Sequence, residues 1–285
     1  MPKTSLQGKP ICITGASSGI GAATAIACAR AGMPVVLAAR RTDRLEALAD
    51  QIRASGGQAL PIACDVTDPD ACRAMVDACI AQFGSIFSVF ANAGYGFIQP
   101  FHKSTDDEWR GIFETNLWGT TNAIRAALPH LLHARSGHIL ICSSCLARFA
   151  IPNYGHYCAT KAAQAQLATS MRHELRPLGV HVSSVHPVGT ATEFFEVSQA
   201  IGGRPDPVIQ QTRRFIQPPE RVAKAIVRCL QRPRPEVWTS LPMRAIAAGI
   251  TLCPTWADWA MRRAGPVELH SEGALGPDVD RELAA

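Results

Sequence analysis

Short apolar runs alternate with longer segments of helical periodicity from residue 10 to residue 240. This alternation is typical of repeated βαβ units, in which each helix returns the chain to the start of the next parallel strand. The apolar runs predict strands near residues 11–14, 35–39, 59–63, 86–91, 137–142, 180–185 and 236–239. Helices are predicted between them, at residues 19–30, 42–54, 69–83, 105–133, 157–176 and 219–231. The pattern therefore predicts an α/β fold with a parallel sheet.

Two stretches lack this regularity: residues 189–218, which are rich in Gly, Pro and Gln, and the end of the chain after Gly265. Long stretches without regular structure are often lids or disordered segments. We therefore expect one domain over residues 1–240, with a substrate lid at about 189–218, and a C-terminal extension over residues 241–285. The extension carries Trp256 and Trp259, and it is interpreted as a lid, a subunit contact or a surface anchor.

The composition narrows the class of protein. A chain of 285 residues, 47% of them hydrophobic, can bury one substantial core. A formal charge of +5 without a basic run argues against a nucleic-acid surface. The ten cysteines fall mostly in apolar periodic segments and are expected to be reduced. No secretory signal and no spanning membrane segment are recognised, so we expect a cytoplasmic protein, with peripheral membrane association through the extension as an alternative.

A glycine-rich turn follows the first predicted strand and leads directly into a helix. The sequence from Thr14 to Gly21 is TGASSGIG, and glycines at such a turn let the backbone approach a pyrophosphate. The alternative is a tight turn in which glycine serves only the backbone conformation. The loop residues expected to bind the cofactor are Gly15, Ser17, Ser18, Gly19, Ile20 and Gly21.

The end of the second predicted strand indicates which cofactor is bound. An acidic residue there would accept hydrogen bonds from the ribose hydroxyls, but the sequence is Ala39-Arg40-Arg41. Guanidinium groups bind a phosphate bidentately, so NADP(H) is preferred to NAD(H). Arg40 is the stronger candidate, whereas Arg41 is equally well explained as a solvated side chain at a helix start.

A tyrosine and a lysine four residues apart form the candidate catalytic pair. On a helix, Tyr157 and Lys161 share one face, so the ammonium is expected to lower the pKa of the phenol toward the working range. Ser144, thirteen residues before the tyrosine, would supply a hydrogen bond to the same substrate oxygen. Taken alone, the Tyr and Lys spacing more often indicates a half-buried ring beside a solvated amine.

Five features in chain order closely resemble those of the short-chain dehydrogenase/reductase family. They are the glycine turn, Asn92-Ala93-Gly94, Asn116, Ser144, and the pair Tyr157 and Lys161. The resemblance covers about residues 8–240. It implies a doubly wound Rossmann fold, with a mostly parallel seven-stranded sheet and helices on both faces. It also implies the interconversion of alcohols and carbonyls with NAD(H) or NADP(H).

The same resemblance assigns roles to individual residues. It implies that Tyr157 is the general acid and base, that Lys161 lowers the tyrosine pKa and binds the nicotinamide ribose, and that Ser144 positions the substrate oxygen. It implies that Asn116 holds a water for proton relay behind the lysine. The other cofactor contacts that it implies are Asp65, Val66, Asn92, Ala93, Gly94, Pro187, Thr190 and Thr192. Val188 stands where the family often has glycine, so the turn after the sixth strand is expected to differ locally.

Aromatic side chains mark the expected substrate side. Phe149, Tyr154 and Phe194 are candidate walls of an apolar pocket for a bulky hydrophobic carbonyl compound. Phe194 and the apolar residues Phe195, Val208, Ile209 and Phe215 would equally well pack the loop onto the body. The chemistry requires no metal.

The leading interpretation is an NADP(H)-dependent oxidoreductase that acts on a small-molecule carbonyl or alcohol. The family resemblance implies a homo-oligomer, either a homodimer or a homotetramer. One alternative is a noncatalytic NADP(H)-binding regulatory or scaffold protein. Another is a membrane-surface protein whose C-terminal extension is the functional part.

Overall fold

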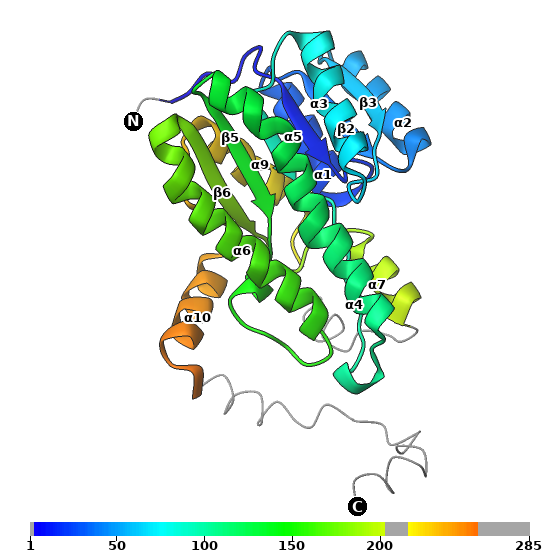
Figure 1. Cartoon of the computed structure of the whole chain (residues 1–285), viewed down its shortest axis with the longest axis vertical. Coiled ribbons are helices and arrows are strands. Elements are labelled where there is room, and N and C mark those ends of the chain that lie inside the picture. Colours follow the sequence, from blue (N-terminus) through cyan, green and yellow to red (C-terminus); the bar gives the residue numbers. More distant parts are fainter. Residues whose placement is uncertain (1–2, 203–215, 256–285) are drawn as a thin grey trace, which may run out of the picture.

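The computed structural model describes residues 3–202 and 216–255 (Figure 1). Seven strands form one sheet in the order β3-β2-β1-β4-β5-β6-β7. Every pairing is parallel, so the sheet is wholly rather than mostly parallel. The strands are β1 (Ile11–Thr14), β2 (Val35–Ala39), β3 (Ala59–Ala63), β4 (Ser88–Ala91), β5 (Gly137–Cys142), β6 (Val180–His186) and β7 (Glu236–Trp238).

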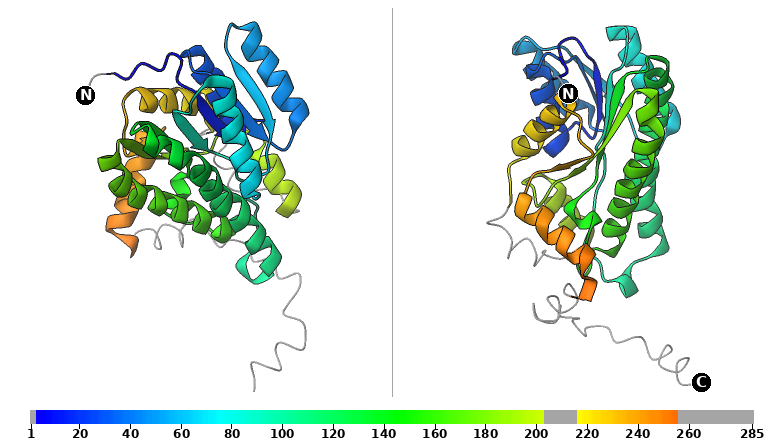
Figure 2. Two further views of the ribbon diagram at one scale, coloured as in Figure 1. Left: turned by 45° about the horizontal axis from the view of Figure 1, so that its top comes forward. Right: turned by 90° about the vertical axis from the view of Figure 1, so that its left-hand side faces the viewer.

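Helices cover both faces of the sheet, as Figure 2 shows. One core lies between the sheet and α1 (Gly19–Arg30), α2 (Thr42–Ala54) and α9 (Pro219–Gln231). The second core lies between the opposite face and α3 (Pro69–Phe83), α5 (Gly119–His133) and α6 (Gly155–Leu175). Strands β1, β2, β4 and β5 are buried along their whole length, because side chains on both faces are covered. The predicted Rossmann architecture is confirmed.

The long helix predicted at residues 105–133 is interrupted in the structure. It consists of α4 (Asp106–Phe113), a π-helical turn η2 (Glu114–Trp118) and α5. α4 starts with a capping box in which Thr105 and Glu108 satisfy each other's backbone N–H groups. A π turn frees backbone groups from the regular helical hydrogen bonds, and such turns are frequent at functional sites. This one carries Asn116.

The region after β6 also differs from the expectation. Residues 189–218 were expected to be irregular, but they contain the helix α7 (Phe194–Gly202). The predicted lid residues Val208, Ile209 and Phe215 lie outside the described residues. In the C-terminal extension, α10 (Leu241–Leu252) begins at the Ser240 cap and contacts the short helix η3 (Cys145–Ala147). Trp256, Trp259 and the rest of the extension lie outside the described part.

The strand order reverses between β1 and β4. These two strands are neighbours, and the chain continues from them into opposite halves of the sheet. Ligands of open α/β sheets bind at such a switch point, beyond the carboxyl ends of the strands. The glycine turn follows β1 and Asn92 follows β4. The topology therefore places the two predicted cofactor segments side by side.

Candidate functional site

The glycine turn between β1 and α1 is shaped to receive an anion. Gly15 and Gly19 have φ angles of +65° and +56°, a backbone region that favours glycine. Ser18 is the N-cap of α1, yet its side chain makes no capping hydrogen bond, and the first turn contains no acidic residue. The start of α1 therefore lacks a side-chain cap, and its positive end is one that an anion could occupy.

Close packing holds this turn against β4. A Cβ atom on Gly21 would lie 2.2 Å from the carbonyl oxygen of Gly15, so only glycine fits there. Asn92 braces the turn from the next strand, because its Nδ2 donates to the carbonyl oxygens of Thr14 at 3.0 Å and Gly15 at 3.3 Å. The backbone N–H groups of Asn92 and Ala93 both donate to Thr14 Oγ1. Asn92 and Ala93 thus hold the glycine turn in place.

The two arginines after β2 point in different directions. Arg41 donates from Nε and Nη2 to Ser17 Oγ at 3.2 and 3.0 Å, and from Nη2 to Ser18 Oγ at 3.0 Å. The Arg40 side chain is 80% exposed, and its Nη1 lies 3.9 Å from Asp65 Oδ2. The structure therefore brings Arg41 to the glycine turn, whereas the sequence favoured Arg40.

Asp65 and Val66 follow β3 at the same edge of the sheet. Hydrogen bonds from Thr67 hold the pKa of Asp65 below its ordinary value. Val66 is buried against α5, where a Cβ atom on Gly119 would lie 2.5 Å from Val66 Cγ2. Asp65 is the exposed member of the pair and is available to a ligand, while Val66 packs the wall behind it.

Ser144, Tyr157 and Lys161 meet beyond the carboxyl end of β5. Ser144 follows this strand, and Tyr157 and Lys161 lie one turn apart on α6. The Ser144 side chain interacts with the Tyr157 phenol and acts to lower its pKa. Lys161 Nζ lies 5.5 Å from the centroid of the Tyr157 ring, and Lys161 is only 4% exposed. The predicted catalytic trio is thus brought together, with Ser144 and Lys161 buried and Tyr157 half-buried.

The direction of the Tyr157 pKa differs from the expectation. Burial raises the pKa of Tyr157 well above its ordinary value, and the hydrogen bond from Ser144 lowers it by less. Burial also lowers the pKa of Lys161 to about 8. Desolvation penalises the charged form of both groups, so it favours the neutral phenol and the neutral amine.

Gln164 is a site residue that sequence analysis missed. Lys161 Nζ donates to the carbonyl oxygen of Cys142 at 2.8 Å and to Gln164 Oε1 at 2.9 Å. Gln164 is fully buried, three residues after Lys161 on α6. A polar side chain at i+3 from the lysine was the available signal, since a buried glutamine requires hydrogen-bond partners.

Asn116 connects the same network to the π turn. Its side chain accepts from Tyr95 N at 2.9 Å and donates to Tyr95 O and Thr160 Oγ1. Its carbonyl oxygen accepts from Thr120 Oγ1 at 2.7 Å and from Gln164 Nε2 at 2.5 Å. A water on this carbonyl, as the family resemblance implies, would have to compete with two protein donors for the two lone pairs.

Gly94, in the loop after β4, packs closely against this network. A Cβ atom on Gly94 would lie 2.9 Å from Asn116 Oδ1 and 3.5 Å from Lys161 Nζ. A side chain at this position would therefore press on both groups.

The segment after β6 closes over the glycine turn. A Cβ atom on Gly19 would lie 2.8 Å from Thr192 Cγ2, so Thr192 lies directly against the turn. Thr190 is buried, and its hydroxyl donates to the Val188 carbonyl oxygen at 2.7 Å and accepts from Gln217. The side chain of Thr190 is therefore committed to the protein. The carbonyl oxygen of Pro187 accepts from Cys145 N, which joins this segment to the one carrying Ser144.

The predicted substrate residues gather unequally. The Phe194 ring lies 5.3 Å from that of Tyr157. The ring of Tyr154, the N-cap residue of α6, lies 6.3 Å from it. Phe149 is half-buried between η3 and α6. Phe194 and Tyr154 are thus the aromatic neighbours of Tyr157.

The sequence model described as short chain dehydrogenase matches residues 9–200, which include the glycine turn, Tyr157 and Lys161. The chain belongs to the short chain dehydrogenase family. It is 33% identical over 266 residues to 11-beta-hydroxysteroid dehydrogenase 1A of Arabidopsis thaliana, covering 90% of this chain and 75% of the relative.

Solved structures of the family superpose on this fold. A short chain dehydrogenase/reductase from Burkholderia phymatum in complex with NAD is 27% identical, with a TM-score of 0.80, and 93% of this chain and 100% of that chain are covered. An alcohol dehydrogenase from Thermococcus sibiricus, complexed with 5-hydroxy-NADP, is 30% identical with a TM-score of 0.69, and the coverage is 80% and 94%. The family thus includes binders of both nucleotides.

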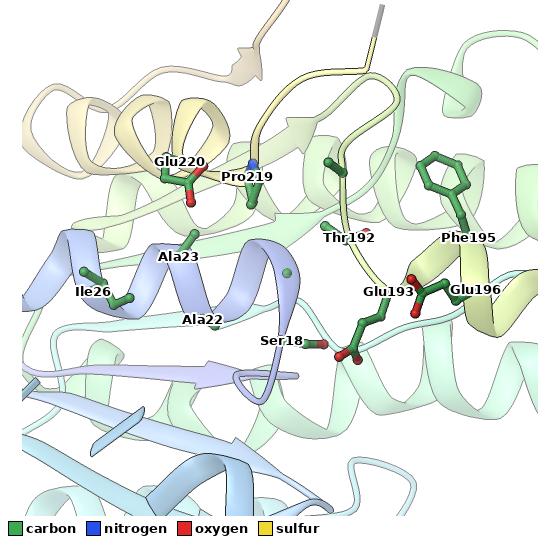
Figure 3. Close-up of a pocket in the computed structure, with 12 residues that line it drawn as sticks. Ser18, Ala22, Ala23, Ile26, Thr192, Glu193, Phe195, Glu196, Pro219 and Glu220 are labelled. Carbon is green, nitrogen blue, oxygen red and sulfur yellow. The ribbon is translucent and has the colours of Figure 1, made fainter. Parts of the chain in front are cut away.

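A hollow of about 710 Å³ lies beside the glycine turn of this dehydrogenase, between α1, α7 and α9 (Figure 3). Ser18, Thr192 and three glutamates, Glu193, Glu196 and Glu220, are among its lining residues. Tyr157 is not in its wall, so the hollow borders the cofactor side of the site rather than the catalytic side. Glu193 is the second site residue that sequence analysis missed.

In the parts of the chain that the structure describes, no group of three His, Cys, Asp or Glu side chains could hold a metal ion. Likewise, none of the described helices is long and apolar enough to cross a membrane.

Proposed function

We propose that this chain is an NADP(H)-dependent oxidoreductase that interconverts a carbonyl and a primary or secondary alcohol on a hydrophobic substrate, with Tyr157 as general acid and base. The observation that carries the proposal is the meeting of Ser144, Tyr157 and Lys161 beside a helix N-terminus that lacks a side-chain cap. A binding-only protein would need the helix terminus but not the catalytic trio.

The protein's own residues divide the work of the reaction. A bound nicotinamide would supply the hydride chemistry. Ser144 and Tyr157 hold the substrate oxygen between them, and Tyr157 donates its proton to the alkoxide as the alcohol forms. Lys161 places a positive charge 5.5 Å from the centre of the phenol ring and would bind a ribose hydroxyl. Lys161 is buried and Tyr157 is half-buried, which limits the access of water to the proton transfer.

The raised pKa of Tyr157 favours one direction of proton transfer. A phenol that keeps its proton through neutral pH is ready to act as the acid of carbonyl reduction. Oxidation of an alcohol requires the phenolate, which forms only at alkaline pH or when a cationic cofactor lies close. We therefore propose reduction as the faster direction near neutral pH.

The preference for NADP(H) rests on Arg41. Its guanidinium is held at the glycine turn by Ser17 and Ser18, and β2 ends without an acidic residue that would repel a 2′-phosphate. Arg40 is exposed beside Asp65 and adds positive charge at the edge of the same site.

The hydrophobic substrate is supported by the surroundings of Tyr157. The rings of Phe194 and Tyr154 lie 5.3 and 6.3 Å from the ring of Tyr157. A pocket with apolar walls and few polar side chains suits a bulky ketone or aldehyde. The name of the Arabidopsis relative, a hydroxysteroid dehydrogenase, points to the same class of substrate.

Nicotinamide fluorescence and absorbance test the proposal. The purified protein is titrated with NADPH and NADH, and NADPH oxidation is followed with a panel of hydrophobic ketones and aldehydes. Tyr157→Phe should bind NADPH as the wild type does and lose turnover by about 10³-fold or more. Tyr95→Phe removes another phenol hydroxyl and serves as the matched control. NADPH binding without oxidation of any substrate would favour a noncatalytic NADP(H)-binding protein.

We also propose that the protein forms a homodimer or a homotetramer and is located in the cytoplasm. Large apolar side chains are exposed on the described surface, among them Leu241, Ile246 and Leu252 on α10. Light scattering of the purified chain, with and without residues 241–285, measures the oligomer and the part that the extension plays in it. A monomer at micromolar concentration would contradict this part of the proposal.

A further inference from the structure

We propose that Glu193 is a specificity-determining residue: it occupies the arginines of the 2′-phosphate site, so that NADP(H) must displace its carboxylate whereas NAD(H) need not. The inference rests on the proposed nicotinamide cofactor. It concerns a residue at the end of the segment after β6, far in sequence from the glycine turn.

Glu193 engages two arginines with its two oxygens. Arg41 Nη1 lies 2.8 Å from Glu193 Oε2, and Arg44 bonds the other oxygen, Oε1. The remaining donors of Arg41 that point to the turn are bonded to Ser17 and Ser18. The carboxylate therefore completes the coordination of the guanidinium that the glycine turn holds.

This arrangement is the one expected of a phosphate stand-in. Carboxylates and phosphates both accept paired hydrogen bonds from guanidinium groups. The two arginines hold the pKa of Glu193 below its ordinary value, so the side chain is charged through neutral pH. Two cations face one carboxylate, which leaves one positive charge unbalanced, and a 2′-phosphate dianion would balance both.

Glu193 also supplies a carboxylate near the end of β2, where the strand itself has no acidic residue. Proteins that prefer NAD(H) carry an acidic residue near the end of this strand to accept hydrogen bonds from the ribose. Here that strand ends in Ala39 and is followed by two arginines, and the carboxylate arrives instead from the opposite side of the turn. With Glu193 in place the site can accept an unphosphorylated ribose, and with Glu193 displaced it can accept the 2′-phosphate.

Competition between Glu193 and the phosphate can be measured by binding. The Kd values for NADPH and NADH are determined by nicotinamide fluorescence at one fixed salt concentration, in wild type, Glu193→Gln and Glu46→Gln. Glu46 is exposed on α2, the helix that carries Arg44, and makes no ion pair with the described arginines, so it is the matched control. Circular dichroism confirms that each variant is folded.

We expect Glu193→Gln to lower the Kd for NADPH by about fivefold, the size of effect that a solvent-exposed ion pair provides. The Kd for NADH should stay the same or rise, and Glu46→Gln should change neither constant. In a background of Arg41→Ala and Arg44→Ala, Glu193→Gln should no longer change the Kd for NADPH, because the carboxylate then has nothing to block.

Two different failures can be told apart. If the wild type binds NADPH and Glu193→Gln binds it equally or more weakly, the inference is overturned and the proposed function stands. If the wild type binds neither nucleotide, the proposed function is overturned and the inference with it.

Discussion

Gln164 accepts a hydrogen bond from the Lys161 ammonium, with 2.9 Å between Oε1 and Nζ, and its amide donates at the same time to the Asn116 carbonyl. One buried glutamine thus joins Lys161 to the π turn between α4 and α5. The lysine is held by α6 and by a second element that approaches from another part of the chain.

Replacement of this glutamine should impair proton transfer more than cofactor binding. In Gln164→Leu, Lys161 loses one of its two acceptors in a buried site, and its pKa should fall below about 8. We expect kcat to fall by about tenfold, with the alkaline limb of the kcat/KM profile shifted to lower pH. The measurement is a pH profile of NADPH oxidation.

Gln166→Leu is the matched control, because Gln166 lies on the same helix and is exposed. An unshifted pH profile in Gln164→Leu would show that the glutamine serves only packing.

The pH dependence of the wild type follows from the buried pair. The pKa of Lys161 is lowered to about 8, so its positive charge is present below this pH and is lost as the pH rises through it. Tyr157 keeps its proton over the same range, because burial raises its pKa. Carbonyl reduction should therefore decline above about pH 8. A decline only near the ordinary lysine pKa of ~10.4 would contradict this assignment.

The two arginines after β2 should contribute unequally to NADPH binding. Arg41→Ala removes the guanidinium that Ser17 and Ser18 hold at the glycine turn, and it should raise the Kd for NADPH by about tenfold or more. Arg40→Ala removes an exposed side chain and should have a smaller effect. Fluorescence titration of both variants with NADPH and NADH measures the difference. A larger loss in Arg40→Ala would restore the ranking that the sequence suggests.

The packing of the glycine turn predicts the cost of one methyl group. In Gly21→Ala the new Cβ would lie 2.2 Å from the Gly15 carbonyl oxygen, so the turn must shift. We expect a loss of about 1–3 kcal/mol in the free energy of unfolding and NADPH binding weakened beyond detection at micromolar concentration. Thermal unfolding and fluorescence titration measure the two effects.

Gly249→Ala provides the control for this substitution. Gly249 lies in α10, and a Cβ atom there would meet nothing within 4 Å. This variant should be as stable as the wild type or slightly more stable. Equal behaviour of the two variants would contradict the close-packing argument.

Most of the fold could be predicted from local patterns. The bounds of α1, α2, α3 and α9 agree with the prediction, because each helix is marked by local signals. In α3, for example, Asp68 caps the start, Pro69 occupies the first turn and Gly84 ends the helix in a left-handed conformation. The predicted helix at residues 105–133 was wrong in its middle, since a π turn leaves no mark in the hydrophobic periodicity.

The sequence by itself determined the order of strands and helices, the glycine turn and the spacing of Tyr157 and Lys161, because these depend on residues close together in the chain. Only the tertiary structure decided which arginine faces the turn, that Glu193 reaches Arg41 across 152 positions, and that Gln164 links Lys161 to Asn116. The sign of the Tyr157 pKa shift belongs to the same group, since burial is set by elements that are distant in sequence and adjacent in space.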